Sequence, residues 1–225
     1  MSSALSLAYI ALICAGLPLL AWFSKKKLDE GLVVPRLPLY AEAFFLQSLL
    51  LLISYGVASV ARVRLFRVPR FDATAVLLGS GVLALALVAM GIGWRLASSH
   101  ARRRLRMLVP TNASERAAWL GVSAVAGISE EVAFRGILPA LLARQTGSFA
   151  LAVAISAVAF ALAHLLQGWG ATLFVGIFGL IFHGLVWITG GLWTAIAVHI
   201  LYDWIAGVTL ARMLSPHEEI ADAQV

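Results

Sequence analysis

The chain is a succession of long apolar runs, each followed by a short connection rich in glycine, proline or basic residues. A helix that crosses the hydrocarbon core of a bilayer needs about 20 predominantly apolar residues, and most of these runs reach that length. The pattern predicts membrane-spanning helices over residues 4–23, 39–60, 73–94, 117–143, 149–166, 171–189 and 192–211. We therefore expect an all-α fold, a polytopic transmembrane helix bundle of about seven to eight spans.

One of these predicted helices differs from the others because it carries a cluster of charges. The run over 117–143 is longer than a simple crossing, so we expect a long tilted helix, or one that bends near Gly127 or Pro139. Its charged residues are Glu130, Glu131 and Arg135. Each charge at the centre of a membrane-spanning helix costs roughly 2.5–3.5 kcal/mol on insertion scales. Such a cluster indicates a functional site that faces a protein-lined or wet interior.

The composition excludes a soluble protein. The chain of 225 residues is 61% hydrophobic and 12% charged, whereas soluble domains carry about 25% charged residues. The net charge of +6 resides largely in the connections, where basic residues contact anionic lipid headgroups and set the topology. We therefore expect the lipid bilayer as a partner and no nucleic acid. The single cysteine, Cys14, excludes an intrachain disulfide and a cysteine metal cluster.

The distribution of charges and histidines divides the chain into three segments. We expect N-terminal spans and basic loops over 1–114, a membrane core that carries the chemistry over 115–212, and a short polar tail over 213–225. Between Ala117 and Ala211 the charged and histidine residues are Glu130, Glu131, Arg135, Arg144, His164, His183, His199 and Asp203. Arg144 lies at a span end and is expected to reach the interface. His183 is expected to serve as a hydrogen-bond partner between helices or to line a wet cavity.

Spacing sorts these residues into pairs. Glu131 and Arg135 are four residues apart and share a helical face, where an ion pair would lower the cost of burying both. His199 and Asp203 repeat this spacing on the last predicted span, so the carboxylate could fix the imidazole tautomer. Glu130 points about 100° away from Glu131 around the helix. Glu130 is therefore the carboxylate that is freer to face a substrate.

The set of residues fits amide hydrolysis in a water-poor site. That reaction needs an activated water, donors that face the developing oxyanion and a proton route to the leaving amine. Glu130 could take a proton from water, and histidines could supply the donors and the route. A second chemistry stays open, in which Glu130, His164 and His199 hold a catalytic zinc ion.

Other proteolytic designs fit the sequence less well. No span contains a His-Glu-x-x-His zinc motif, and an aspartyl dyad would need a second membrane aspartate beside Asp203. Ser129 lacks the second glycine of a nucleophile elbow, so we expect its hydroxyl to bond to the local backbone. The water-activating carboxylate and the zinc site described above therefore both stay open.

Three motifs in this region resemble those of the CPBP family, the CAAX-protease and bacteriocin-processing intramembrane proteases related to the CAAX prenyl endopeptidase. Glu-Glu-x-x-x-Arg matches Glu130–Arg135, and Phe-x-x-x-His matches Phe160–His164. Histidine followed four residues later by asparagine or a similar polar residue matches His199–Asp203. The family more commonly has asparagine at this last position. An ionised Asp203 cannot donate to an oxyanion, and two roles stay open for it: to orient His199 or to serve as an acid.

The resemblance implies an intramembrane endopeptidase with its active site buried between the C-terminal four helices, in a bacterial inner (cytoplasmic) membrane. Glu130 would activate water, aided by His164, and Glu131 and Arg135 would support that geometry. His199 and Asp203 would help to bind the oxyanion or position the water. The family has been described both as metal-dependent and as glutamate-type. We favour the metal-free form, since zinc ligands would have to come from three separate helices, and zinc stays an alternative.

The resemblance also implies a substrate that the membrane delivers. This would be a membrane protein or a lipidated or anchored peptide, cleaved near its C-terminus or its membrane anchor. Both a prenylated and an unprenylated substrate are compatible with the sequence, and so are a monomer and an oligomer. A non-enzymatic membrane protein is the alternative class, either a transporter or a bacteriocin-immunity or sequestering protein. A transporter would more often show an inverted internal repeat, and the sequence shows none.

Overall fold

The computed structural model describes residues 3–32, 34–66 and 72–213, and these residues form helices without strands. The α-helices are α1 (Ser3–Ala11), α2 (Leu17–Asp29), α3 (Arg36–Ala61), α4 (Ala73–Leu96), α5 (Ser99–Leu108), α6 (Ala113–Glu130), α7 (Leu138–Thr146), α8 (Phe149–Ala163), α9 (Trp169–Thr189) and α10 (Trp193–Met213). Two π-helical segments, η1 (Leu12–Gly16) and η2 (Glu131–Ile137), and a 3₁₀ turn, η3 (Leu165–Gln167), connect some of them. The predicted tail over 213–225 lies outside the described residues apart from Met213.

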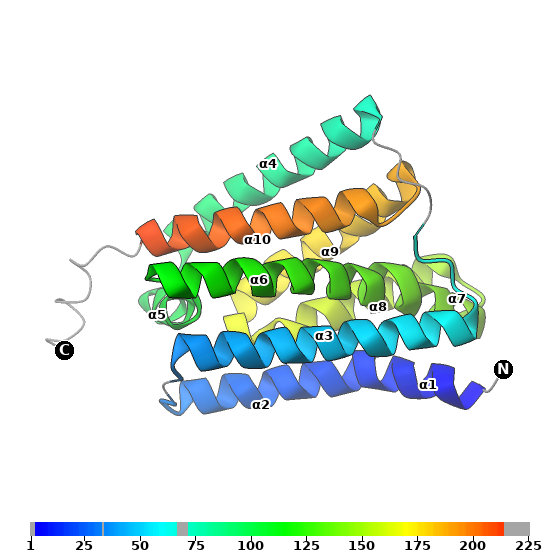
Figure 1. Cartoon of the computed structure of the whole chain (residues 1–225), viewed down its shortest axis with the longest axis horizontal. Helices are drawn as coiled ribbons and strands as arrows, with labels where there is room; N and C mark the ends of the chain where they lie inside the picture. The colour runs from blue at the N-terminus through cyan, green and yellow to red at the C-terminus, as the bar shows by residue number, and fades with distance from the viewer. Residues whose placement is uncertain (1–2, 33, 67–71, 214–225) are drawn as a thin grey trace, which may run out of the picture.

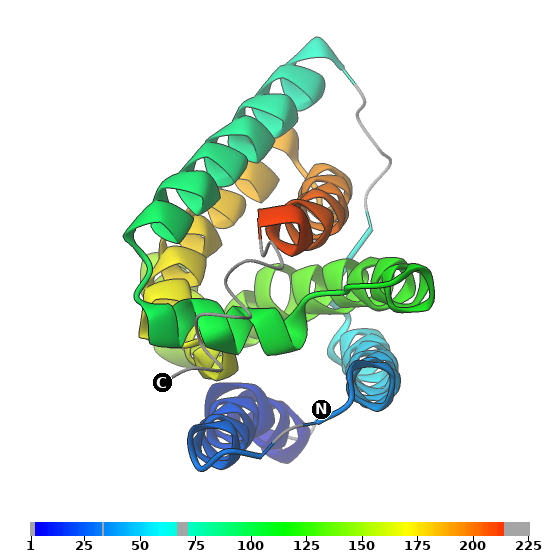
Figure 2. The same ribbon diagram turned by 90° about the vertical axis from the view of Figure 1, so that its left-hand side faces the viewer.

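The helices form a bundle whose centre is the long helix that carries the charges. Figure 1 shows α3, α6 and α10 running side by side, with α6 in the middle, and α6 packs against both of its neighbours. Helix α8 packs against α7 and α9, and α2 packs against α8. Helix α4 contacts α9 and α10 and lies on the outer side of the bundle (Figure 2). Residues from the first and last thirds of the chain therefore meet at α6.

The predicted fold class, a polytopic transmembrane helix bundle, is confirmed. Within the described residues, six helices are long and apolar enough to cross a membrane by length and composition: Ala4–Asp29, Arg36–Ala61, Ala73–Leu96, Ala113–Thr146, Trp169–Thr189 and Trp193–Met213. The remaining predicted span, 149–166, corresponds to the shorter apolar helix α8. Helix α8 ends before His164, where the backbone leaves the helical path and enters η3.

The distribution of polar and apolar side chains is the inverse of that in a soluble bundle. Large apolar side chains cover the outside, with Leu77 72% and Leu96 81% exposed, while Glu131 in the interior is 0% exposed. Hydrocarbon tails are as apolar as leucine, so an outward-facing leucine costs nothing in a bilayer. A charged group, by contrast, is tolerated only where other protein groups surround it.

The long charged helix departs from regular geometry between the two positions at which a bend was predicted. The irregularity is the π-helical segment η2, which begins at Glu131, after Gly127 and before Pro139. Pro139 lies at the start of α7, directly after η2. π-Helical turns inside α-helices occur frequently at functional sites. Here the wide turn carries Glu131 and Arg135.

One element was wrongly predicted as a loop. The arginine-rich connection after the third span contains α5, whose N-cap residue Ser98 accepts a hydrogen bond from the Ala101 N–H. Arg104 on α5 is buried and forms an ion pair with Asp29 at the end of α2. The basic residues of this segment therefore include a buried ion-pair partner as well as surface positions.

Close packing of α6 against α10 leads to a first prediction. A methyl group on Gly207 would overlap the indole ring of Trp119, whose Nε1–H donates to the Asp203 carbonyl oxygen over 2.9 Å. We expect Gly207→Ala to destabilise the protein by about 1–3 kcal/mol, because the rigid ring has to move. Equilibrium unfolding in mixed micelles measures this change.

Gly121→Ala is the matched control, because nothing lies within 4 Å of a methyl group built there. Alanine also has the higher helix propensity, so Gly121→Ala is expected to leave the stability unchanged or to raise it. Equal stabilities of Gly207→Ala and the unmodified protein would show that the two helices do not depend on this contact.

Candidate active site

Three candidate side chains from three helical segments converge in the bundle interior. The Oε2 atom of Glu130 lies 3.7 Å from Nε2 of His164 and 3.7 Å from Nε2 of His199. Glu130 is the last residue of α6, His164 follows the end of α8, and His199 lies within α10. The predicted convergence of these three residues is therefore confirmed.

The hydrogen bonds of the two imidazoles define which nitrogen atom faces Glu130. Nδ1 of His164 lies 2.8 Å from the Phe160 carbonyl oxygen, and Nδ1 of His199 lies 2.8 Å from Oε1 of Glu131. A carbonyl oxygen only accepts, and so does an ionised carboxylate, so each Nδ1 carries the proton. In the neutral imidazoles both Nε2 atoms are then free to accept a proton from a group near Glu130.

Glu131 occupies the centre of a buried ionic group. Its Oε1 accepts hydrogen bonds from Nη1 of Arg135 over 2.9 Å and from Nδ1 of His199. The predicted ion pair between Glu131 and Arg135 is therefore present, with the two side chains 0% and 2% exposed. Removing either member would leave the other charge buried without its partner.

The predicted role of Asp203 as the residue that fixes the tautomer of His199 is wrong. Asp203 lies on the other side of the ring, with Oδ2 3.8 Å from Nε2 of His199. The partner of Nδ1 is instead Glu131, which is 68 positions away in the sequence. Asp203 is the more accessible carboxylate, since 27% of its side chain is exposed, against 11% for Glu130.

Aromatic rings enclose the charged groups. The guanidinium of Arg135 lies 4.0 Å from the ring centroid of Phe160 and 5.4 Å from that of Phe182. The Phe160 ring also packs edge to face against His164, with 4.6 Å between centroids. These contacts stabilise the cation and hold His164 in place. The four-residue spacing of the Phe-x-x-x-His motif thus brings these two rings into contact.

One polar residue at this site was missed by the sequence analysis. Gln47 on α3 donates from Nε2 to Oε1 of Glu130 over 2.6 Å and accepts at Oε1 from the Ser129 hydroxyl over 2.5 Å. The cluster is therefore not confined to the C-terminal four helices, because α3 contributes to it. The available signal was a glutamine in the middle of the mostly apolar run over 39–60. Ser129 also contacts the Ala126 carbonyl oxygen, as predicted for a local backbone bond.

Two further predicted residues lie outside this cluster of hydrogen bonds. Arg144 donates from Nη1 to the Ala61 carbonyl oxygen over 2.9 Å, so it provides a hydrogen-bond donor for a backbone carbonyl at the C-terminal end of α3. His183 on α9 is 8% exposed, and its Nε2 has no hydrogen-bond partner among the described residues. The predicted hydrogen bond of His183 to another helix is thus absent at that atom.

The alternative with zinc concerns how the candidate donor side chains are placed. Within residues 3–32, 34–66 and 72–213, no group of three or more His, Cys, Asp or Glu side chains is placed so that it could hold a metal ion. Glu130, His164 and His199 nevertheless converge, and the choice between the metal-free and the zinc chemistry stays a prediction.

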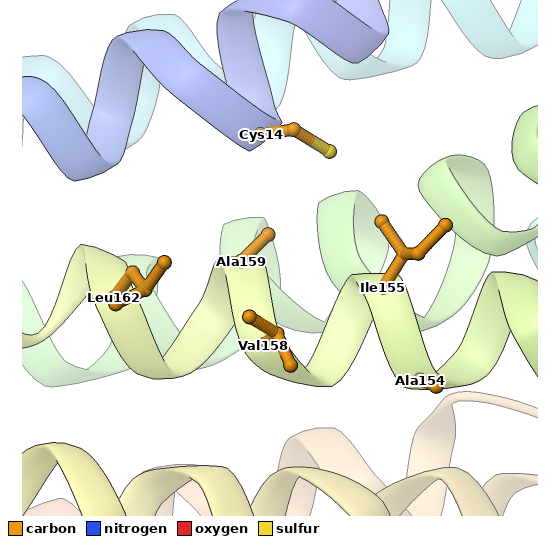
Figure 3. A pocket seen from close by; sticks show the side chains of 6 residues that line it. All are labelled: Cys14, Ala154, Ile155, Val158, Ala159 and Leu162. Carbon is orange, nitrogen blue, oxygen red and sulfur yellow. The ribbon is translucent and has the colours of Figure 1, made fainter.

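An apolar groove on the outside of α8 is separate from the cluster (Figure 3). It has a volume of about 270 Å³, and its lining residues are Cys14, Ala154, Ile155, Val158, Ala159 and Leu162. The lining contains no charged or histidine side chain, so it offers no group for acid–base chemistry.

Comparison with known proteins connects this geometry to a protein family. Residues 112–205 match the family model Rce1-like, described as type II CAAX prenyl endopeptidase Rce1-like. The matched segment contains the three motifs, and the match confirms the family that they predict for this part of the chain. The comparisons with curated proteins and with solved structures found no match. The family and the six apolar helices together support an integral, multi-pass membrane endopeptidase that acts on a membrane-anchored peptide or protein.

Proposed function

We propose that the chain is a glutamate-type intramembrane endopeptidase in which Glu130 activates the attacking water. The observation that carries this proposal is the position of Glu130 Oε2, 3.7 Å from Nε2 of both His164 and His199. This oxygen is buried and accepts no hydrogen bond from the described residues. Such an oxygen is available to take a proton from water, and the two imidazoles flank the place where the reaction would occur.

The proposed reaction begins when the water oxygen attacks the scissile carbonyl carbon and Glu130 takes a proton from that water. A protonated Nε2 of His199 donates to the oxyanion that forms, and Glu131 compensates the charge of this imidazolium through Nδ1. The proton on Glu130 then passes to the amide nitrogen, the C–N bond breaks, and the products are a carboxylic acid and an amine, which exchange a proton to become carboxylate and ammonium. His164 holds the water or relays the proton. Asp203 positions water beside Nε2 of His199.

We propose a mechanism without a metal ion, and a substrate that reaches the site from the bilayer. The first part is supported by Oε2 of Glu130, which is free to take a proton from water, and by the origin of the three candidate ligands on three separate helical segments. Stoichiometric zinc in active, purified protein would contradict it. The second part is supported by the matched family, and by the position of the cluster among helices with apolar outer surfaces. The cleaved bond would lie near the C-terminus or the membrane anchor of the substrate.

Cleavage by the purified protein in lipid vesicles tests this proposal. One probe is a fluorogenic peptide with a farnesylated Cys-aliphatic-aliphatic-x terminus, and the second carries the same cleavage sequence on an apolar anchor helix. We expect the unmodified protein to cleave at least one probe, and a folded Glu130→Ala variant to cleave neither above the background. Failure of the unmodified protein on both probes, or equal rates for Glu130→Ala, would overturn the proposal.

A further inference from the structure

We propose that Gln47 is a positioning residue for Glu130, an inference that rests on the proposed function. Gln47 belongs to α3, outside the segment 112–205 that matches the protease family. Its amide nevertheless bridges two neighbouring residues of the charged helix, Ser129 and Glu130. The bridge joins the N-terminal part of the chain to the carboxylate that is proposed to activate water.

The direction of the hydrogen bonds fixes how the amide is oriented. The Ser129 hydroxyl lies 2.5 Å from Oε1 of Gln47, and Nε2 of Gln47 lies 2.6 Å from Oε1 of Glu130. The reverse orientation would place the amide oxygen against a carboxylate oxygen, and both atoms are acceptors. Ser129 can donate to an acceptor, whereas an ionised Glu130 cannot. The carboxylate therefore selects the amide orientation, and the Ser129 hydroxyl, which can donate, is compatible with it.

This bond makes the two oxygens of Glu130 inequivalent. Oε1 is occupied by the Gln47 amide, whereas Oε2 has no hydrogen-bond partner among the described residues and faces the two Nε2 atoms. Without the amide, the carboxylate could rotate about its terminal bond, since such torsions have broad minima. Reactive groups that lie about 1 Å from their productive position can lose roughly 10²-fold in rate. Gln47 thus acts through Glu130 and touches neither water nor substrate.

The test replaces Gln47 with leucine, which has a similar size and offers no donor. We expect Gln47→Leu to lower kcat by about 10- to 100-fold with little change in KM, because misplacing Glu130 impairs the chemical step. The measurement uses the probe peptide that the unmodified protein cleaves, in the same vesicles. A Gln47→Glu variant, which lacks the donor when ionised, is expected to lose at least as much. Ser48→Ala is the matched control, since the Ser48 hydroxyl donates to the Phe44 carbonyl oxygen of its own helix.

A double substitution separates positioning from a general structural role. In a Glu130→Gln background, whose residual rate is measurable, Gln47→Leu is expected to cause no further loss, because the proton acceptor that it positions is gone. Ser129→Ala is likewise expected to have a smaller effect beside Gln47→Leu than alone. A kcat within twofold of the unmodified protein in folded Gln47→Leu, or independent effects of Gln47→Leu and Glu130→Gln, would overturn the inference.

The outcomes distinguish this inference from the proposed function. If neither probe is cleaved, the proposed function fails. The hydrogen bond between Gln47 and Glu130 is then still tested by the unfolding constants of four proteins: the unmodified protein, the two single variants and the double variant. The effect of Gln47→Leu on the unfolding constant is then expected to depend on the residue at position 130. Additive effects would show that Gln47 and Glu130 do not interact. If the unmodified protein cleaves and Gln47→Leu keeps its full rate, only the positioning role fails.

Discussion

A Glu130→Gln variant is expected to stay folded and to cleave its substrate about 10³-fold more slowly than the unmodified protein. The substitution preserves the size of the side chain and removes its capacity to take a proton from water. The rest of the cluster is expected to keep its arrangement, because His164 and His199 hold their Nδ1 atoms on Phe160 and Glu131 rather than on Glu130. Initial rates in vesicles, measured beside the thermal unfolding midpoint, separate lost chemistry from lost structure.

Glu42→Gln is the control for this experiment. Glu42 lies near the start of α3 and is exposed, so its substitution removes a carboxylate without affecting the cluster. We expect the rate of Glu42→Gln to equal that of the unmodified protein. A folded Glu130→Gln protein with an unchanged rate would refute the role of Glu130 as the proton acceptor.

Arg135→Met is expected to lower the free energy of unfolding by about 3–5 kcal/mol. Methionine fills most of the volume between the rings of Phe160 and Phe182, so lost packing contributes little. The main cost is that Glu131, which is 0% exposed, keeps its charge in the protein interior without the guanidinium. Equilibrium unfolding in mixed micelles measures the change.

Two further variants identify the cause of this loss. Arg212→Met changes an exposed arginine in the last turn of α10 and is expected to alter stability by less than about 0.5 kcal/mol. The double variant Glu131→Leu with Arg135→Met removes both charges and is expected to be more stable than Arg135→Met alone. A loss of less than about 1 kcal/mol for Arg135→Met would contradict a buried ion pair at this position.

The sequence predicted the helices well because a span needs a minimum apolar length. The runs over 39–60 and 73–94 correspond to Arg36–Ala61 and Ala73–Leu96. Helix α5 was missed because dense arginines are typical of a loop, although they can also line one face of a short helix. The end of α8 was misplaced because apolar residues continue past His164 while the backbone turns there. Hydropathy reports which residues avoid water, and it does not report where hydrogen bonding changes.

Local pairs in the site could be predicted and distant ones could not. The ion pair of Glu131 with Arg135 follows from a spacing of four residues in the sequence. The bond from His199 to Glu131 spans 68 positions, and that from Gln47 to Glu130 spans 83. Such contacts depend on how α3 and α10 are rotated against α6, and one sequence contains no measure of that rotation. Spacing in the sequence therefore identified the candidate catalytic residues, but it missed some of the residues that hydrogen-bond to them.

The order of synthesis gives the ion pair at Glu131 a role before the protein is complete. The helix over Ala113–Thr146 leaves the ribosome ahead of α10, so its glutamate has no imidazole partner during that interval. Arg135 is made only four residues after Glu131 and can neutralise it at once, which lowers the cost of lateral release into lipid. At that stage α3 has already been made, so Gln47 is available to Glu130 before His199 has been translated. The order of synthesis therefore suits the arrangement of charges. Each buried charged side chain has a partner that was made earlier or that follows within about one helical turn, and α10 adds the last partner, His199.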